Sequence, residues 1–462
     1  ADAMGWSGGW VRTPNLDRMG AGGGRFTSAV TNTPVCIPAR VSQVTGHYPH
    51  NTHIWDNFRH DLPAETRTWW QAIRNAGYRT SIFGKTHLHH HSGDLRDREH
   101  LVHAYGMDDV NEIGGPRASA RCASHMTERW EKLNLWRKYK DDYAERFRSK
   151  PYVAHPSALP LTEYADVYVG QQAKNYLQNY DRDQPWFCHV SFGGPHEPWD
   201  APEPYASMYR PEDMPIPIAS HETLHGDELS GLIGRKLARA AQNPPIPSPK
   251  DIAAMRANYA GNVTLIDDQI GEILEVIEQR GELHNTVIAF SSDHGEMNGD
   301  HGLIYKGHFL NGALRVPLLM RTPTTAAEKP VTDKTCDSPV EWFDIGPTLV
   351  ELADGKLEHQ QFAKSLCPML EDPNREHRAF AVSEISGEVM LMDRQWKLMF
   401  NCRGEPYLLF DQLNDPRETV NSLDKPQNRE LVNRMTEALL AHFIQTQVDL
   451  SSKRDEAVGA RS

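Results

Sequence analysis

The side chains of this sequence that could carry out chemistry lie in a few short motifs. Cys36-Ile37-Pro38-Ala39-Arg40 places a thiol two residues before a proline and four before an arginine. A cysteine in this position is either a small buried hydrophobic residue with an unreactive sulfur or a residue at the position of a nucleophile. Later motifs offer positive charge for an anionic group, a proton donor and metal ligands, namely Gly84-Lys85-Thr86-His87, Gly194-Pro195-His196, Ser292-Asp293-His294-Gly295 and Lys306.

The pentapeptide at Cys36 resembles the C-x-P-S/A-R signature of the type I sulfatases, in which the cysteine is oxidised to formylglycine. Five residues alone are a weak signal, but the segments on both sides are similar to those of the family as well. The later motifs recur in the family's order and approximate spacing, so the resemblance runs from residue 1 to about the last helix. It is carried by those motifs together with Val11-Arg12-Thr13-Pro14-Asn15-Leu16-Asp17-Arg18, Phe26, Thr45-Gly46-His47-Tyr48-Pro49-His50-Asn51 and Arg315-Val316-Pro317.

The resemblance implies a role for each motif in the hydrolysis of a sulfate ester. Cys36 becomes formylglycine, whose hydrate offers one hydroxyl to attack sulfur and a second to expel the sulfate and restore the aldehyde. Arg40, one helical turn along, holds the hydrate through its planar donors, where the alternative is a surface salt bridge. Lys85 neutralises sulfate oxygens and His87 bonds the hydrate. Their i, i+2 separation places both on one side of an extended segment.

His196 and Lys306 resemble the family's pair beside the scissile ester, which protonates or neutralises the leaving oxygen. The alternative for His196 is a core histidine with satisfied hydrogen bonds. The run His89-His90-His91 could suggest a transition metal, but neighbouring side chains point in different directions, which favours a solvated loop or a substrate-lining role. Asp300-His301-Gly302 predicts a structural turn from which His301 could line the pocket.

Asp293 and His294 resemble the metal pair that follows a late central strand of the family. The resemblance implies one divalent cation, most often calcium, bound by Asp293, His294 and the modified Cys36. Histidine is an unusual calcium ligand, so His294 could instead sit beside the sulfate. The family's two further carboxylates directly precede the segment that begins here at Ala1, so Asp2 receives no ligand role. We therefore expect a chain truncated at its N-terminus, without one central strand and half of the metal site.

Composition excludes several classes of function. The 462 residues, with 39% hydrophobic and 24% charged side chains, suffice for one large soluble domain or two to three smaller ones. The formal net charge of −13 argues against general binding of nucleic acid or anionic membranes, because those surfaces require broad positive patches. No apolar run is long enough to predict a transmembrane helix. The six cysteines lack CxxC pairs and zinc-like spacing, and five remain beside Cys36, so the redox compartment stays open.

The elements that would position the motifs alternate between strands and helices. Apolar runs at 78–83, 186–192 and 286–291 each end just before a motif, so three strands are expected to deliver candidate chemistry at one end of a sheet. A strongly amphipathic helix is predicted over 252–280. This order indicates a large, mostly parallel sheet flanked by helices, in agreement with the alkaline phosphatase-like sulfatase fold that the resemblance implies.

The rest of the chain predicts an insertion, a surface excursion and a smaller C-terminal unit. Residues 92–160 lack strand-like alternation and predict a helical or irregular insertion, and 218–250 predict a long surface excursion. We expect a catalytic domain over 1–374, a subdomain over 375–450 with a four-stranded antiparallel sheet and one helix, and a polar tail over 451–462. The strands and the helix of this subdomain are expected at 379–384, 388–393, 396–400, 406–410 and 427–446.

The expected function is that of a sulfatase, acting on a sulfated carbohydrate because long insertions could line an extended cleft. The first alternative is a phosphonate monoester or phosphodiester hydrolase of the same superfamily, since sulfuryl and phosphoryl groups present similar oxygens. The second is a relative that binds a sulfated ligand without catalysis. Trp55, Asn57 and His308 are candidate substrate-binding residues. The expected partners are a sulfated small molecule or saccharide and a formylglycine-generating enzyme, in a periplasmic or secreted location, with a cytoplasmic one left open.

Overall fold

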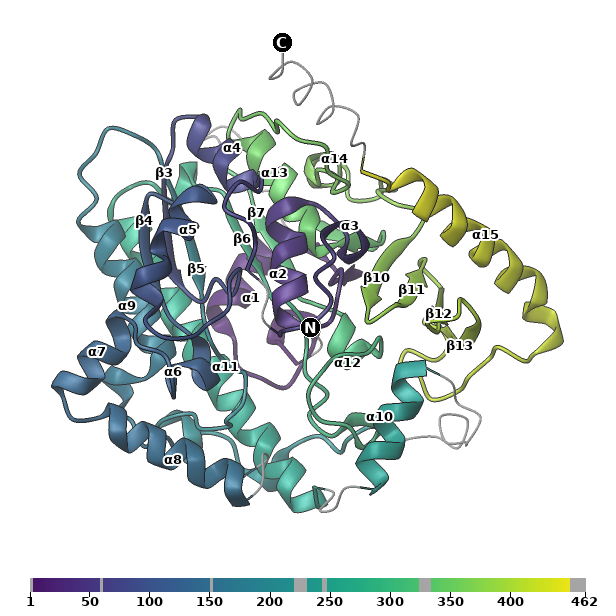
Figure 1. The fold of residues 1–462 in the computed structure, drawn as a ribbon, viewed down its shortest axis with the longest axis horizontal. Coiled ribbons are helices and arrows are strands. Elements are labelled where there is room, and N and C mark those ends of the chain that lie inside the picture. Colours follow the sequence, from purple (N-terminus) through teal and green to yellow (C-terminus); the bar gives the residue numbers. More distant parts are fainter. Residues whose placement is uncertain are drawn as a thin grey trace, which may run out of the picture.

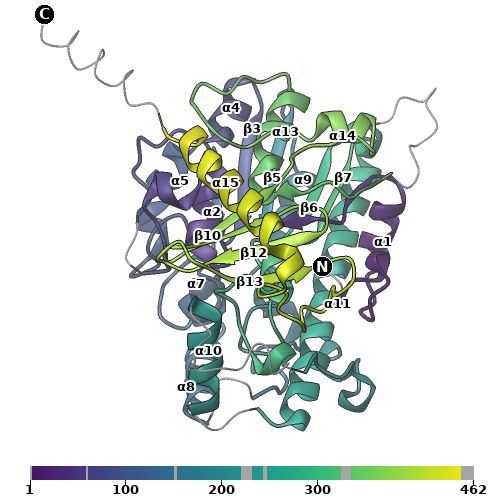
Figure 2. The same ribbon diagram turned by 90° about the vertical axis from the view of Figure 1, so that its right-hand side faces the viewer.

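The computed structural model describes residues 3–58, 61–149, 153–219, 231–242, 247–323 and 334–448. Most of them form a large body in which helices cover the strands from both sides (Figure 1). A smaller antiparallel sheet lies beside this body, with the helix α15 (Arg429–Gln445) along its outer side (Figure 2). These layers confirm the predicted α/β fold class.

The first of the main sheets is wholly parallel and has the strand order β4-β3-β5. β3 (Arg79–Gly84) lies in the centre, between β4 (Asp109–Glu112) and β5 (Trp186–Ser191). The strands predicted over 78–83 and 186–192 are thereby confirmed.

β4 lies in the insertion that was predicted to be helical or irregular, so that prediction missed a strand. β4 contains no apolar run, because its polar side chains form ion pairs and hydrogen bonds with polar side chains of other segments. Asp109 forms an ion pair with Arg79 of β3, and Glu112 accepts hydrogen bonds from buried histidines. An edge strand with such partners lacks the hydrophobic alternation by which strands are recognised.

The third predicted strand belongs to a second, mixed sheet with the order β6-β7-β1-β8. β6 (Ile288–Ser291) pairs antiparallel with β7 (Leu318–Arg321), which pairs antiparallel with β1 (Gly24–Phe26). β1 pairs parallel with β8 (Lys334–Cys336). The strands are thus divided between two sheets, whereas the sequence indicated a single, mostly parallel one.

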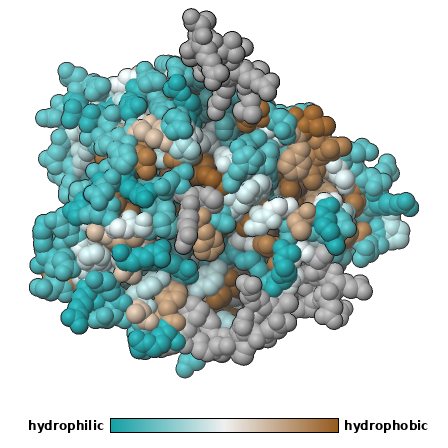
Figure 3. All heavy atoms as spheres, viewed as in Figure 1, coloured by the Kyte–Doolittle hydropathy of each residue, from teal (hydrophilic) through white to brown (hydrophobic). Residues whose placement is uncertain are grey.

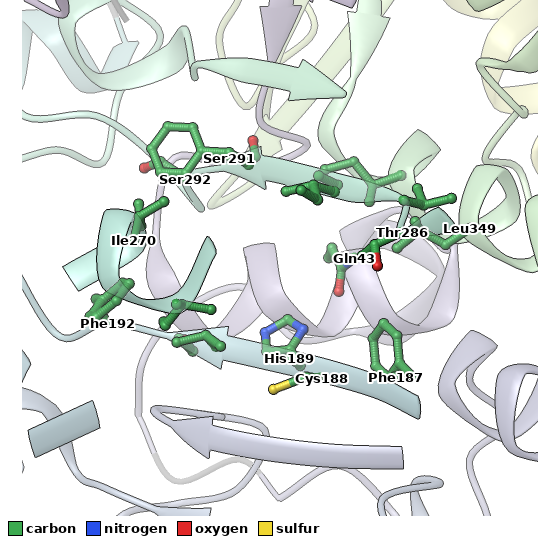
Figure 4. A pocket seen from close by; sticks show the side chains of 18 of the residues that line it. Gln43, Phe187, Cys188, His189, Phe192, Ile270, Thr286, Ser291, Ser292 and Leu349 are labelled. Carbon is green, nitrogen blue, oxygen red and sulfur yellow. The ribbon is translucent and has the colours of Figure 1, made fainter. Parts of the chain in front are cut away.

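A cavity of about 810 Å³ separates β5 from β6. The edge of β5 away from β3 and the edge of β6 away from β7 have no strand partner among the described residues. Figure 4 places Phe187 and Thr286 at one end of this cavity and Phe192 and Ser291 at the other. The two strands therefore run in the same direction along opposite walls, and the sheet is interrupted where the cavity lies.

Helices cover both faces of the parallel sheet. α11 (Pro249–Gln279) confirms the predicted long amphipathic helix and begins with a capping box, in which Ser248 Oγ accepts from the N–H of Asp251 and the Asp251 carboxylate accepts from Ser248 N–H. α11 and α9 (Ala165–Gln178) pack on one face. α4 (Trp69–Asn75) packs on the other.

The antiparallel sheet and α15 form the smaller C-terminal unit. β10 (Ala381–Ile385), β11 (Glu388–Met392), β12 (Trp396–Phe400) and β13 (Pro406–Asp411) pair in sequence order. The four predicted strands and the helix are confirmed, with every end within two residues. The division into domains stays a prediction, and the predicted polar tail lies outside the described residues.

Short elements connect these layers. The predicted excursion over 218–250 contains the helix α10 (Gly231–Gln242), while 220–230 and 243–246 lie outside the described residues. The remaining helices and strands are α1 (Pro14–Ala21), β2 (Ala29–Val30), α2 (Cys36–Thr45), α3 (Pro49–Thr52), α5 (Glu99–Ala104), α6 (Gly115–Ser119), α7 (His125–Lys132), α8 (Trp136–Ser149), α10 (Gly231–Gln242), α12 (Asn311–Leu314), β9 (Val340–Glu341), α13 (Ile345–Leu352) and α14 (Cys367–Glu371).

The surface in Figure 3 is mostly hydrophilic, with apolar side chains gathered over α15. Leu440 and Ile444 of that helix are exposed. Within the described part of the chain, no helix has both the length and the apolar character needed to cross a membrane.

Candidate active site

Cys36 is the first residue of α2, and its side chain is buried. Pro38 lies in the first helical turn, where its missing N–H breaks no helical hydrogen bond. Asn57 Oδ1 accepts a 2.8 Å hydrogen bond from the N–H of Ile37 and so holds the start of the helix. Because a helix N-terminus carries partial positive charge, this position favours an anion.

Cationic side chains surround the Cys36 thiol. Sγ lies 3.1 Å from Nε2 of His294 and also contacts His196. Burial raises the pKa of the thiol, but the charges of Lys85, Lys306 and His294 outweigh burial, so that the pKa lies well below its usual value. The site therefore stabilises negative charge at residue 36.

Lys85 and His87 reach the thiol from the end of β3. Gly84 ends the strand with φ of 114°, and a Cβ there would lie 1.9 Å from the carbonyl oxygen of Ser191. That oxygen also accepts from Lys85 N–H at 3.0 Å. His87 has φ of 56°, so the segment turns instead of staying extended as predicted. His87 nevertheless contacts the thiol and the charge of Lys85 acts on it, and burial lowers the pKa of both side chains.

His196 and Lys306 form the predicted pair. Lys306 Nζ lies 2.8 Å from Nε2 of His196, which follows β5. Burial lowers the pKa of Lys306, but the charges of Cys36 and Glu197 raise it above its ordinary value. Burial also lowers the pKa of His196, and Glu197 again reverses the effect. The surroundings thus favour positive charge on this pair, despite its burial.

Arg40 forms an ion pair in which each side chain is only 14% exposed, so the pair is not a surface salt bridge. Its Nε donates to Asp293 Oδ2 at 2.9 Å, and Nη1 donates to the Lys85 carbonyl at 2.7 Å and to Ser191 Oγ at 2.9 Å. Burial raises the pKa of Asp293, but His294 and Arg40 outweigh it, and the pKa falls below the ordinary value. Arg40 thereby ties α2 to the ends of β3, β5 and β6.

Cys36, Asp293 and His294 have ligand atoms within 4.8 Å of one another and could hold a metal ion. Calcium takes about six to eight oxygens. This group offers a single carboxylate, of which one oxygen is bound by Arg40, together with an imidazole and a thiol. The donor set among the described residues does not amount to a calcium site, so we derive no chemical step from calcium.

His89 and His91 are buried against Glu112, so the prediction of a solvated loop is wrong. His89 Nε2 lies 2.8 Å from Glu112 Oε2, and His91 Nε2 lies 3.2 Å from Oε1. Residues two apart in a chain can point to the same side, as these two do. The ring centroid of His91 lies 4.7 Å from that of His87, so the cluster of His89, His91 and Glu112 packs against His87.

The three candidate substrate-binding residues lie in different surroundings. Asn57 is next to Cys36 at the start of α2, and Trp55 is half-buried in the same loop. His308 is buried, and after burial the nearby cations, among them Lys397 of β12, lower its pKa. It therefore lies toward the C-terminal sheet. His301 is buried in the short turn that was predicted around it.

Sequence analysis missed Glu197, Arg117 and Ser191. Glu197 directly follows His196, and its Oε2 lies 2.7 Å from His196 Nδ1, while Arg117 of α6 contacts its other oxygen. A carboxylate beside a motif histidine is a signal that could have identified Glu197. Arg117 and Ser191 carry no such signal, since only the fold brings them to the site.

Comparisons with known proteins agree over most of the chain. A family model described as Sulfatase matches residues 1–355, and one described as N-sulphoglucosamine sulphohydrolase, C-terminal, matches 299–445. An arylsulfatase of Clostridium perfringens is 27% identical over 95% of this chain and 91% of its own length. A choline-sulfatase of Rhizobium meliloti is 25% identical over 90% of this chain and 79% of its own length.

Solved structures share the fold. The phosphonate monoester hydrolase of Agrobacterium radiobacter has a TM-score of 0.75 and 24% identity, with 96% of this chain and 94% of that chain covered. A protein solved in complex with its substrate D-glucosamine-2-N,6-O-disulfate has a TM-score of 0.71 and 20% identity, with 96% and 95% covered. Since the Sulfatase model spans residues 1–355 and thus most of the sequence, the chain belongs to the sulfatase family.

Proposed function

We propose that this sulfuric ester hydrolase acts on a sulfated carbohydrate through a formylglycine, which a formylglycine-generating enzyme forms from Cys36. The observation that supports the proposal most is the set of cations around the buried thiol. An unmodified thiol that attacked sulfur would remain as a stable sulfated enzyme. The aldehyde hydrate would supply one hydroxyl for the attack and a second through which the sulfate is released.

The charged side chains suit an anionic substrate group. Lys85 is buried and Lys306 partly buried, and the charges of both act on residue 36, where they would neutralise sulfuryl oxygens. Such charges stabilise a transition state more strongly in a buried site than in water. The pair of His196 and Lys306 would give one proton to the ester oxygen as its bond to sulfur breaks. Arg40 would keep Asp293 and the strand ends in place.

A sulfated saccharide is the proposed substrate class. One relative of the same fold was solved with D-glucosamine-2-N,6-O-disulfate, which carries sulfate on a sugar. A polysaccharide substrate would place the enzyme in the periplasm or outside the cell. Assays with saccharides sulfated at defined positions would identify the sugar and the position of its sulfate.

Phosphonate monoester hydrolysis is the second candidate function. Its support is the fold shared with the phosphonate monoester hydrolase of Agrobacterium radiobacter. Tetrahedral sulfuryl and phosphoryl groups present similar oxygens to the same cations, so these motifs barely separate the two activities.

Turnover of an aryl sulfate and of an aryl phosphonate, each by the matured protein and by Cys36→Ala, tests the proposal. We expect faster release of sulfate than of phosphonate, and a loss of about a thousandfold or more in the variant. Faster phosphonate hydrolysis would favour the second candidate. Binding of sulfated ligands without any turnover would favour a non-catalytic role.

We also propose that an extended segment of the protein fills the cavity between β5 and β6 as an additional strand. The support is the pair of strand edges along an apolar cavity that have no partner strand in the described part of the chain, since buried backbone N–H and C=O groups require partners. Met4 lines the same cavity, so a strand could lead directly into the N-terminal segment. One end of the cavity is lined by Asp293, where such a strand could bring the further carboxylates that calcium needs.

A further inference from the structure

Glu197 is a buried carboxylate directly behind the proposed proton donor. Only 1% of its side chain is exposed, and Oε2 lies 2.7 Å from Nδ1 of His196. On the opposite side of the same ring, Nε2 lies 2.8 Å from Nζ of Lys306. The imidazole therefore lies between the Glu197 carboxylate and the Lys306 ammonium group.

The neighbours of His196 determine which ring nitrogen carries the proton. The hydrogen bond of Nδ1 is to the Glu197 carbonyl oxygen at 2.9 Å, and the Glu197 carboxylate is a close ionic contact at 2.7 Å from the same nitrogen. Nε2 faces the ammonium group of Lys306, which can only donate. Nδ1 must then carry a proton, and Nε2 is the nitrogen available to exchange a proton with Lys306 and the substrate.

Pairing with Arg117 alone does not account for the position of Glu197. The Arg117 side chain is 53% exposed and would be solvated without its partner. A buried carboxylate is costly unless its partners compensate for the loss of water. His196 and Lys306 are the partly buried basic side chains beside it. Burial raises the pKa of Glu197, but His196 and Lys306 outweigh burial and lower it to about 2.

We propose that Glu197 is a positioning residue for proton donation to the leaving group. It fixes the tautomer and the orientation of His196 and stabilises the positive charge of the pair with Lys306. In the step it supports, the bond between sulfur and the ester oxygen breaks, the electron pair stays on that oxygen, and one proton from the pair adds to it. This inference rests on the proposed sulfatase function, and Glu197 acts through His196 without touching the substrate.

The leaving-group dependence of hydrolysis tests this role. We expect Glu197→Gln to lower kcat/KM about tenfold for 4-nitrophenyl sulfate, whose leaving group departs with little protonation. For phenyl sulfate, whose leaving group needs a proton, we expect a loss of about a hundredfold. In a His196→Gln background the same change should have almost no further effect. Equal losses for both substrates, or full additivity with His196→Gln, would refute the role.

A matched control is Glu203→Gln. Glu203 also precedes a proline across a cis peptide bond, but its side chain is exposed. We expect this variant to hydrolyse both aryl sulfates at the rates of the unaltered protein. A wild-type protein that hydrolyses neither substrate would count against the proposed function, and the next measurement tests Glu197 without any turnover.

Proton NMR of the unaltered chain reports on the contact between His196 Nδ1 and the Glu197 carboxylate. An imidazole N–H held against a carboxylate resonates far downfield, so we expect one such signal that disappears in His196→Gln. In Glu197→Gln the signal should move upfield, because an amide is a weaker acceptor than a carboxylate. Absence of the signal in the unaltered protein, or an unchanged position in Glu197→Gln, would overturn the inference.

Discussion

Cys36 combines full burial with surroundings that favour negative charge. Burial alone would raise the pKa of a thiol, as it does for Cys188, where the pKa rises to about 12. At Cys36 the charges of Lys85 and Lys306 reverse the effect. Strongly shifted pKa values with specific charged partners are typical of functional sites. The contrast between these two cysteines of one chain therefore separates a residue surrounded by cations from one that has none of them beside it.

Asp200 gives the fold a pH dependence of its own. Burial raises the pKa of this carboxyl from its ordinary 3.8 to about 7, although Arg146 and a hydrogen bond from Tyr164 act in the opposite direction. Between these pH values the unfolded chain releases a proton that the folded chain keeps. Stability therefore falls as the pH rises from about 4 to about 7, and it stays lower above that range.

We expect Asp200→Asn to remove this loss, which is on the order of 4 kcal/mol. The asparagine can still accept from Tyr164 but cannot ionise. Calorimetry at pH 5 and pH 8 should show a larger fall in Tm for the unaltered protein than for the variant. Equal falls would mean that Asp200 is not the responsible group.

The site residues differ in how far the sequence predicts them. Cys36, Lys85 and His196 stand in motifs with family-like order, so their convergence could be expected. Arg117 could not be identified in the same way, because its ion pair with Glu197 joins distant segments and depends on the fold, whereas the position of Glu197 directly after His196 was a usable signal. The turn at His87 was missed too, since a positive φ in a non-glycine residue leaves no mark in a motif.

At the scale of elements, the site depends on how closely β3 and β5 end together. Gly84 permits this approach, because its φ is 114° and a Cβ would meet the Ser191 carbonyl oxygen at 1.9 Å. The next residue, Lys85, donates to that same oxygen. The junction therefore sets the direction in which Lys85 enters the site.

We expect Gly84→Ala to destabilise the protein by at least about 2 kcal/mol more than Gly77→Ala. Gly77 is the matched control, because its φ is 98° and nothing lies within 4 Å of the added Cβ. Both variants carry the strain of a positive φ, so the difference reports the contact with Ser191. Denaturant unfolding measures it, and equal losses of stability would contradict a tight junction.

The strands were predicted correctly where the local sequence pattern determines the pairing. The prediction failed where the pairing joins segments that are far apart in the chain. β10 to β13 follow one another in an antiparallel order, with turn residues between apolar runs, so neighbours in sequence are neighbours in space. β4 was missed because its polar residues pair with side chains from distant segments. The division of the main strands into two sheets has no local signal at all.

For the whole molecule, the cavity between β5 and β6 is the feature that most affects the site. The cavity lies along the two strands that lead to His196 and Asp293. A segment that filled it would therefore contact the strands that position both side chains. Cys188 and His189 of β5 line the cavity as well. An additional strand there would join the two sheets into the continuous one that the sequence indicated.

We expect a chain extended ahead of Ala1 by a strand of alternating apolar residues to melt several degrees higher than the chain without this extension. Cys188 should also react more slowly with a thiol reagent, as measured by peptide mass spectrometry with Cys188→Ala to assign the signal. An extension of the same length with a central proline is the control, because it cannot pair with both edges. Equal effects of the two extensions would show that no strand enters the cavity.

The measurement that tests the formylglycine proposal most directly is the mass of the proteolytic peptide that contains residue 36. The chain is produced together with a formylglycine-generating enzyme, and a sulfatase known to be modified serves as the control in the same host. We expect the peptide to have lost the mass that separates a cysteine side chain from an aldehyde, and the modified fraction to rise in step with sulfate release. An unmodified Cys36 beside a fully modified control would contradict the proposal.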